Sequence, residues 1–226
     1  MDITYYGQSC FKINSKKGSF LFDPFISPNE LAKDIAVDSI ECDYMLISHG
    51  HEDHIADAEQ IAKNCNPTIV SNFEIVSWFG AKGFKKLHPM NLGGAWNFDF
   101  GRLKMVNAVH SSILPDGTYA GNPGGFILEI DQKKVYYAGD TALHSDMKLI
   151  GEFEKPDLAF LPIGDNFTMG IEDAIRAAKM IHCKEIIGMH YDTFPYIEIN
   201  KKDAITQFAE AGLNLTLIAI GDSINF

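Results

Sequence analysis

The sequence contains little cysteine and no long hydrophobic run. Four of its 226 residues are cysteines, and none forms a Cys-x-x-Cys pair. This usage is typical of a reduced intracellular protein and argues against a disulfide-stabilised scaffold. No apolar run approaches the roughly 18 residues that a membrane-spanning helix needs. Strand-like residues begin at Ile3, which leaves no room for a signal peptide. We therefore expect a cytoplasmic protein that does not contact a membrane.

Positive charge is also scarce. The chain has 19 lysines and arginines against 30 aspartates and glutamates, which gives a net charge of −11. This balance argues against a nucleic-acid partner and leaves a small molecule as the expected substrate. Bound divalent cations would offset part of the charge and make one cleft locally positive. A homo-oligomer is compatible with the sequence.

Apolar patterning predicts many short strands, followed in the last third by alternating helices and strands. Strands are expected at residues 3–6, 10–13, 19–22, 44–47, 68–70, 86–90, 95–98, 102–109, 125–130, 134–138, 158–162, 185–189 and 216–220. Helices are expected at residues 55–64, 73–79, 147–153, 171–181 and 201–211. With 46% apolar residues, the chain can bury a sizeable core as a single domain over residues 1–226. The pattern predicts an α+β fold with two mixed β-sheets covered by helices.

The most informative segment places three histidines and an aspartate within six residues. Residues 47–54 read Ile-Ser-His-Gly-His-Glu-Asp-His and lie between an expected strand and an expected helix. Neutral imidazole and carboxylate are ligands that Zn²⁺, Mn²⁺ and Fe²⁺ prefer. His49 and His51 lie two apart on extended backbone, so both rings can point to one ion. Asp53 has a second interpretation as the N-cap of the following helix.

Three further candidate ligands each follow a predicted strand. They are His110, Asp140 and His190. Taken singly, such a residue is more often a hydrogen-bonded loop residue than a metal ligand. Taken together, all three lie at the carboxyl end of a strand, as the first cluster does, and could converge at one sheet edge. We therefore predict one metal centre that gathers residues from distant parts of the chain.

The order of these residues resembles the metallo-β-lactamase superfamily over nearly the full chain. Four shorter segments are similar to the UPF0173 metal-dependent hydrolases, a branch that is itself similar to ascorbate-6-phosphate lactonase. These segments are Tyr6-Gly7-Gln8-Ser9-Cys10-Phe11, Phe22-Asp23-Pro24-Phe25, Tyr137-Ala138-Gly139-Asp140-Thr141 and Met189-His190-Tyr191-Asp192-Thr193-Phe194-Pro195. The resemblance implies a four-layer αβ/βα sandwich with two divalent ions at one edge, zinc being expected first and manganese or iron being alternatives. His49, His51 and His110 would hold one ion, Asp53, His54 and His190 the other, and Asp140 would bridge both.

The same resemblance implies a dinuclear hydrolase in which a metal-bridging hydroxide cleaves a small ester, lactone or phosphoester. No Gly-x-Ser-x-Gly segment is present to supply a serine nucleophile. Asp53 is the predicted catalytic residue, because a ligand of the second ion would lie beside the water and could orient it and carry its proton. Asp140, shared between two cations, would be too acidic for that role.

Four other residues and one loop have two interpretations each. Gln8 stands where this branch usually has histidine; it can hydrogen-bond near the metals but cannot titrate near pH 7. Asp23 is either a turn residue before a proline or an acceptor that orients a ligand histidine. His144 is either a surface residue or a proton donor at the cleft, and Tyr191 is either packed in its loop or aimed at substrate. The loop over residues 111–125 either lines the cleft or is structural.

Three other functions are compatible with a metal centre. A nuclease on this fold would resemble tRNA-maturing enzymes, but those carry an added arm or domain for RNA, and no segment here is long enough to form one. An iron-dependent oxygen- or thiol-handling protein typically has a joined redox domain and a carboxylate at the position of His51. A non-catalytic, metal-stabilised module would not need a complete ligand set. The hydrolase is therefore the leading hypothesis.

Overall fold

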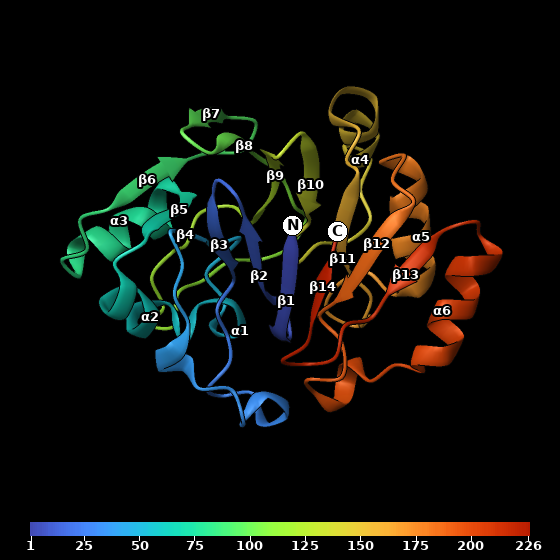
Figure 1. Cartoon of the computed structure of the whole chain (residues 1–226), viewed down its shortest axis with the longest axis horizontal. Coiled ribbons are helices and arrows are strands. Elements are labelled where there is room, and N and C mark those ends of the chain that lie inside the picture. The colour runs from blue at the N-terminus through green and yellow to red at the C-terminus, as the bar shows by residue number, and fades with distance from the viewer.

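The computed structural model describes residues 1–226, and its strands form two seven-stranded sheets (Figure 1). The first sheet has the order Ser223–Asn225 (β14), Asp2–Gly7 (β1), Cys10–Ser15 (β2), Gly18–Phe22 (β3), Tyr44–Leu46 (β4), Thr68–Asn72 (β5) and Leu87–Met90 (β6). The second has the order Asn214–Thr216 (β13), Glu185–Met189 (β12), Leu158–Pro162 (β11), Lys133–Tyr137 (β10), Gly124–Ile130 (β9), Gly101–Asn107 (β8) and Ala95–Phe98 (β7). Each sheet is mixed, with antiparallel strands on one side and parallel strands on the other.

Helices cover the outer face of each sheet (Figure 1). The first sheet is covered by Glu52–Ile55 (α1), Ala58–Cys65 (α2) and Phe73–Ala81 (α3), and the second by Met147–Leu149 (α4), Ile171–Met180 (α5) and Lys201–Glu210 (α6). Shorter turns are Glu30–Ala32 (η1), Val37–Ser39 (η2), the π-helical Ile150–Glu154 (η3) and Pro195–Ile197 (η4). The resulting four layers confirm the predicted sandwich. The longest helices have ten residues each, too few to cross a membrane.

Helix α5 shows how the sequence selects these layers. Ala174, Ala177 and Ala178 recur at helical spacing and are fully buried. On the opposite face, Arg176 forms exposed ion pairs with acidic residues of the first turn. Small buried residues let the helix lie close to the second sheet, while the charged face stays in water.

The core between the sheets is built largely from aromatic rings. Phe11 of β2 meets Phe160 of β11 edge to face at a centroid distance of 4.7 Å. Phe22 at the end of β3 stacks on Tyr137 at the end of β10, with centroids 4.6 Å apart. All four side chains are essentially inaccessible to solvent. These contacts fix the distance between the sheets where their strands end, which is where the candidate ligands lie.

Two expected elements are wrong in detail. The helix predicted at residues 55–64 is two helices, because the chain breaks at Asp57, whose buried carboxylate accepts hydrogen bonds from the backbone of Ile26 and Ser27. The strand predicted at residues 216–220 is also misplaced. Its apolar residues pack into the core, but pairing ends at β13, and the chain then crosses to the first sheet to form β14. The apolar residues at 216–220 therefore indicate that the segment is buried against the core, but they do not indicate that it pairs as a strand.

Candidate metal centre

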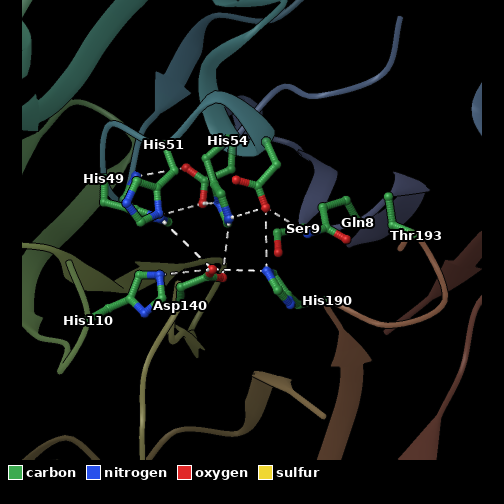
Figure 2. Close-up of polar contacts among 12 residues, drawn as sticks. Gln8, Ser9, His49, His51, His54, His110, Asp140, His190 and Thr193 are labelled. Carbon is green, nitrogen blue, oxygen red and sulfur yellow. Dashed lines mark hydrogen bonds and ion pairs between the residues drawn. The ribbon is translucent and has the colours of Figure 1, made fainter. Parts of the chain in front are cut away.

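The candidate ligands lie at the edge where strand ends of both sheets meet (Figure 2). The segment from His49 to His54 follows β4 of the first sheet, and it is joined there by loops that follow β1 and β3. His110, Asp140 and His190 follow β8, β10 and β12 of the second sheet. Strands β8 and β10 are each antiparallel to β9, so they run in the same direction, and their carboxyl ends reach this edge together.

Three histidines form the first group of candidate ligands. One ring nitrogen each of His49, His51 and His110 lies within 4.8 Å of the other two. His49 Nε2 and His51 Nδ1 are 3.0 Å apart, as expected for side chains that point to the same side of extended backbone. His49 is fully buried, and its other ring nitrogen lies 3.0 Å from Ser48 Oγ. The ring is therefore held with Nε2 toward the group.

The second group comprises Asp53, His54, Asp140 and His190, whose ligand atoms also lie within 4.8 Å of one another. His190 Nε2 is 3.0 Å from Asp140 Oδ2, and His54 Nε2 is 3.2 Å from Asp140 Oδ1. Asp140 also lies 3.5 Å from His110 of the first group. Asp140 thus stands between the two groups, as a bridging ligand would.

Asp23 fixes the orientation of the His54 ring. Its buried carboxylate lies 2.8 Å from His54 Nδ1 and accepts hydrogen bonds from the Ser48 backbone and hydroxyl and from the Tyr137 hydroxyl, at 2.6–2.7 Å. The contact between Asp23 and a candidate ligand histidine, which the sequence left open, is present. It leaves His54 Nε2 free to face Asp140. The roles of Ser48 and Tyr137 were not predicted, although both residues lie within the site motifs.

Gln8 occupies a tight turn beneath Asp53. Its φ is +54°, in the left-handed region, and the residue is fully buried. Its side-chain Nε2 donates a 2.9 Å hydrogen bond to Asp53 Oδ2, while its carbonyl accepts one from the backbone N–H of His190. One residue therefore positions a candidate ligand from each sheet.

Asp53 lies in the first turn of a helix but does not cap it. His51 occupies the N-cap position of α1 without a capping side chain, and Asp53 lies in the first turn. Asp53 Oδ2 contacts Gln8 and lies 3.5 Å from both His54 Nε2 and His190 Nε2. The N-cap interpretation is therefore wrong, and this side chain is turned to the cluster.

The metal-free cluster has strongly perturbed protonation. Burial would lower the pKa of His54, but the carboxylates of Asp140 and Asp53 raise it well above its usual value. Burial would likewise raise the pKa of Asp140, but the rings of His190 and His54 hold it well below its usual range. The pKa of His49 is lowered well below its usual value by burial and by the charge of His54. In the absence of metal, protonated histidine therefore supplies the positive charge that neutralises the buried carboxylates.

The residues present fit divalent metal ions. His54 Nε2 and Asp140 Oδ1 are buried and form an ion pair at 3.2 Å, but neither has a hydrogen-bond partner. Unpaired buried polar atoms are unfavourable unless another partner satisfies them. A cation would satisfy both, and a set of imidazoles and carboxylates without thiolate suits zinc, manganese or iron.

Ligand candidates from both groups line a cavity of about 700 Å³. His144 does not reach it and instead lines a separate cavity with Asp146 and Glu154. Tyr191 is 5% exposed and packs beside Tyr5, with ring centroids 6.5 Å apart, so it belongs to the core. Neither side chain lines the cavity with the candidate ligands, so the structure gives no support to His144 as a donor at the cleft or to Tyr191 as a substrate contact.

The loop over residues 111–125 is mainly structural. Only Ser111 of this loop lines the cavity. The side chain of Asn72 donates to the carbonyls of Ala120 and Asn122 and so ties the loop to the first sheet. The loop packs so closely on the histidine-rich turn that a Cβ at Gly50 would lie 2.5 Å from Ala120 Cβ. Glycine is therefore needed between His49 and His51.

Comparison with known proteins identifies the family. Residues 2–190 match a family model described as a β-lactamase superfamily domain. The UPF0173 metal-dependent hydrolase of Flavobacterium johnsoniae is 54% identical over 224 residues, which is 99% of each chain. This chain belongs to the UPF0173 branch of the metallo-β-lactamase superfamily. It is accordingly a metal-dependent hydrolase.

Solved structures agree with this assignment. Igni18, a metallo hydrolase from the archaeon Ignicoccus hospitalis, superposes with a TM-score of 0.90 at 33% identity, covering 100% of this UPF0173 chain and 97% of the archaeal one. The isothiocyanate hydrolase from Delia radicum gut bacteria superposes with a TM-score of 0.80 at 19% identity, covering 100% and 99% of the two chains. The second comparison shows a shared fold alone.

We predict that the metal-free hydrolase loses stability as pH rises. Burial lowers the pKa of His190, but Asp140 and Asp53 raise it to a net value of about 9. A raised pKa stabilises the fold fully below the unfolded value of about 6.5 and ceases to do so as pH passes 9. The free energy of unfolding should fall by about 2–3 kcal/mol across this window. Bound metal should flatten the slope, because the ion replaces the protons.

Urea unfolding at several pH values, with and without zinc, measures this slope. His190→Asn should reduce it in the metal-free protein. His182→Asn, at an exposed helix end, is the matched control. A metal-free slope of zero or of opposite sign would contradict the assigned charge of the cluster.

Proposed function

We propose that this UPF0173 hydrolase binds two divalent cations and hydrolyses a small ester, lactone or phosphoester. The observation that carries the proposal is the pair of neighbouring donor groups, with Asp140 of the second group 3.5 Å from His110 of the first. One ion would be held by His49, His51 and His110, and the other by Asp53, His54 and His190, with Asp140 between them. Ions bound there would acidify a water molecule near neutral pH and stabilise negative charge that develops on the substrate.

In this proposal Asp53 orients the attacking water and carries its proton. Its Oδ2 is held by Gln8, and its side chain is 23% exposed and lines the cavity. Asp140 is 2% exposed and is surrounded by imidazoles on both sides. Burial opposes the charged form of Asp53, but His54 and His190 hold its pKa well below the usual range, so it is ionised and can accept a hydrogen bond that orients the water.

Metal analysis combined with a substrate screen tests the proposal. The protein is loaded separately with zinc, manganese or iron and then offered carboxylic esters, lactones and phosphoesters. We expect two ions per chain at saturation and turnover of one bond type with at least one metal. Saturation at one ion, or the absence of hydrolysis with every ion, would contradict the proposal.

We further predict that Gln8 supports turnover through Asp53. Gln8→Ala removes the donor to Asp53 Oδ2 and should lower kcat about 10–100-fold with little loss of bound metal. Gln8→His, which restores the residue usual in this branch, should retain activity. Gln60→Ala, which removes an exposed donor to Asp38, is the control. Steady-state kinetics at matched metal content decide the matter, and unchanged kcat in Gln8→Ala would contradict this role.

A further inference from the structure

An aromatic wall stands beside the candidate metal centre. We use this name for Phe25, Phe167, Phe194 and Tyr196, which all line the same cavity as the ligands. They form two pairs, with ring centroids 6.3 Å apart for Phe25 and Phe194 and 6.2 Å apart for Phe167 and Tyr196. The rings come from segments that follow β3, β11 and β12, so both halves of the chain build the wall.

Half of the wall is exposed to solvent. Phe167 is 49% exposed and Tyr196 is 74% exposed, although both are large aromatic side chains. In the other pair, Phe25 is 4% exposed and Phe194 is half-buried. A group of apolar rings that is left open beside a reactive centre can bind an apolar ligand group.

The cavity is lined by no lysine or arginine. Its ionisable lining residues are histidines, carboxylates and Tyr196. Lys201, in the helix that follows this part of the wall, is paired with Asp192 at 2.9 Å. Glu52 adds an exposed carboxylate at the rim. Positive charge would therefore come from the bound cations alone, directly at the scissile bond.

We propose that the substrate is a neutral carboxylic ester or lactone whose apolar or aromatic group packs against the aromatic wall. The inference rests on the proposed function. A phosphate or carboxylate remote from the cations would lose hydration against these rings and find no lysine or arginine to pair with. In the reaction, the oxygen of water bonds to the acyl carbon, the acyl carbon–oxygen bond breaks, and the departing oxygen takes a proton. The products are a carboxylic acid and an alcohol from an ester, or a single hydroxy acid from a lactone.

Binding of hydroxamates to the zinc-loaded protein tests the substrate class without relying on turnover. The hydroxamate group ligates zinc and is kept constant, while the tail is varied. Acetohydroxamate has almost no tail, octanohydroxamate has an apolar tail, and suberomonohydroxamate has the same chain length but ends in a carboxylate. We expect octanohydroxamate to bind at least about tenfold more tightly than acetohydroxamate, because of its buried methylenes, and suberomonohydroxamate to lose most of that gain.

Two variants connect this preference to the wall. Phe167→Ala combined with Tyr196→Ala should reduce the advantage of the octyl tail at least about threefold and leave acetohydroxamate binding unchanged. Phe153→Ala, which truncates a ring that is 67% exposed outside this cavity, should change neither. Calorimetry gives the dissociation constants, and p-nitrophenyl hexanoate compared with p-nitrophenyl hydrogen adipate extends the test to turnover.

Each outcome has a distinct meaning. If zinc-loaded protein binds no acetohydroxamate, the proposed metal function fails. If it binds acetohydroxamate but gains nothing from the octyl tail, or prefers the carboxylated tail, only the substrate class is overturned. If sedimentation shows a dimer that the double variant dissociates, a second copy covers the wall, which also overturns the proposal.

Discussion

Asp53→Ala should lower kcat by about 10²–10⁴-fold in samples of matched metal content, with the fold intact. The carboxylate is turned to the cluster by Gln8 and is the more exposed of the two cluster aspartates. Its Oδ1 makes no hydrogen bond or ion pair and is free to meet a water molecule in the cavity. Steady-state kinetics at saturating metal, with metal analysis of each sample, give the measurement.

An exposed carboxylate outside the cavity supplies the control for this prediction. Glu210, at the end of α6, is exposed and does not line the cavity. Glu210→Ala should therefore leave kcat within about threefold of wild type, as expected for a surface change away from the reacting atoms. Turnover close to wild type in Asp53→Ala would remove Asp53 from the mechanism.

Asp23→Ala should have the largest combined effect on stability and metal affinity. The buried carboxylate accepts hydrogen bonds from the Ser48 backbone and hydroxyl and from Tyr137, and it also contacts His54. Its removal leaves the buried Ser48 backbone N–H and His54 Nδ1 without this partner, while the Tyr137 hydroxyl can still donate to the Ser9 carbonyl. The free energy of unfolding should therefore fall by about 3–5 kcal/mol. Affinity for the second metal should fall about 10–100-fold, because the His54 ring loses its anchor.

A substitution of Asp57 distinguishes the effect of Asp23→Ala on stability from its effect on metal affinity. It is also buried, and its carboxylate accepts backbone hydrogen bonds from Ile26 and Ser27, but it contacts no candidate ligand. Asp57→Ala should therefore destabilise the fold by about 1–3 kcal/mol without changing metal affinity. Denaturant unfolding and metal titration measure both quantities. Equal losses of metal affinity in the two variants would show that Asp23 acts only through general stability.

The sequence predicted the convergence of distant ligands because each follows a strand end. His110, Asp140 and His190 are far apart in the chain, but the carboxyl ends of β8, β10 and β12 reach one edge. The resemblance to a known superfamily supplied the division into two groups, and the geometry is compatible with it. Whether each residue binds metal stays a prediction.

Side chains outside the ligand set were harder to predict, because short spacing along a loop does not fix direction. His144 lies four residues after Asp140, yet its loop turns toward α4 and into a different cavity. Tyr191 directly follows His190 but packs on the opposite side, against Tyr5. Strand β14 could not be predicted from its three residues, because it forms only by pairing with β1 across the whole chain.

The aromatic wall was missed for a related reason. Its rings come from three separated segments, and none has a periodic pattern that marks it as functional. Phe25 and Phe194 each lie two to four residues after a site residue, Asp23 or His190, and this proximity was the available signal. This proximity indicates a binding surface only in combination with the exposure of Phe167 and Tyr196, which the sequence does not give.

The stacking of Phe22 on Tyr137 has a consequence for how this enzyme tolerates change. Each donor group draws ligands from both sheets, so the thickness of the ring layer sets the gap between ligands that would share one ion. Conservative substitutions there would leave the sandwich folded but alter that gap by fractions of an ångström. Substitutions in the aromatic core should therefore lower kcat before they measurably lower the free energy of unfolding.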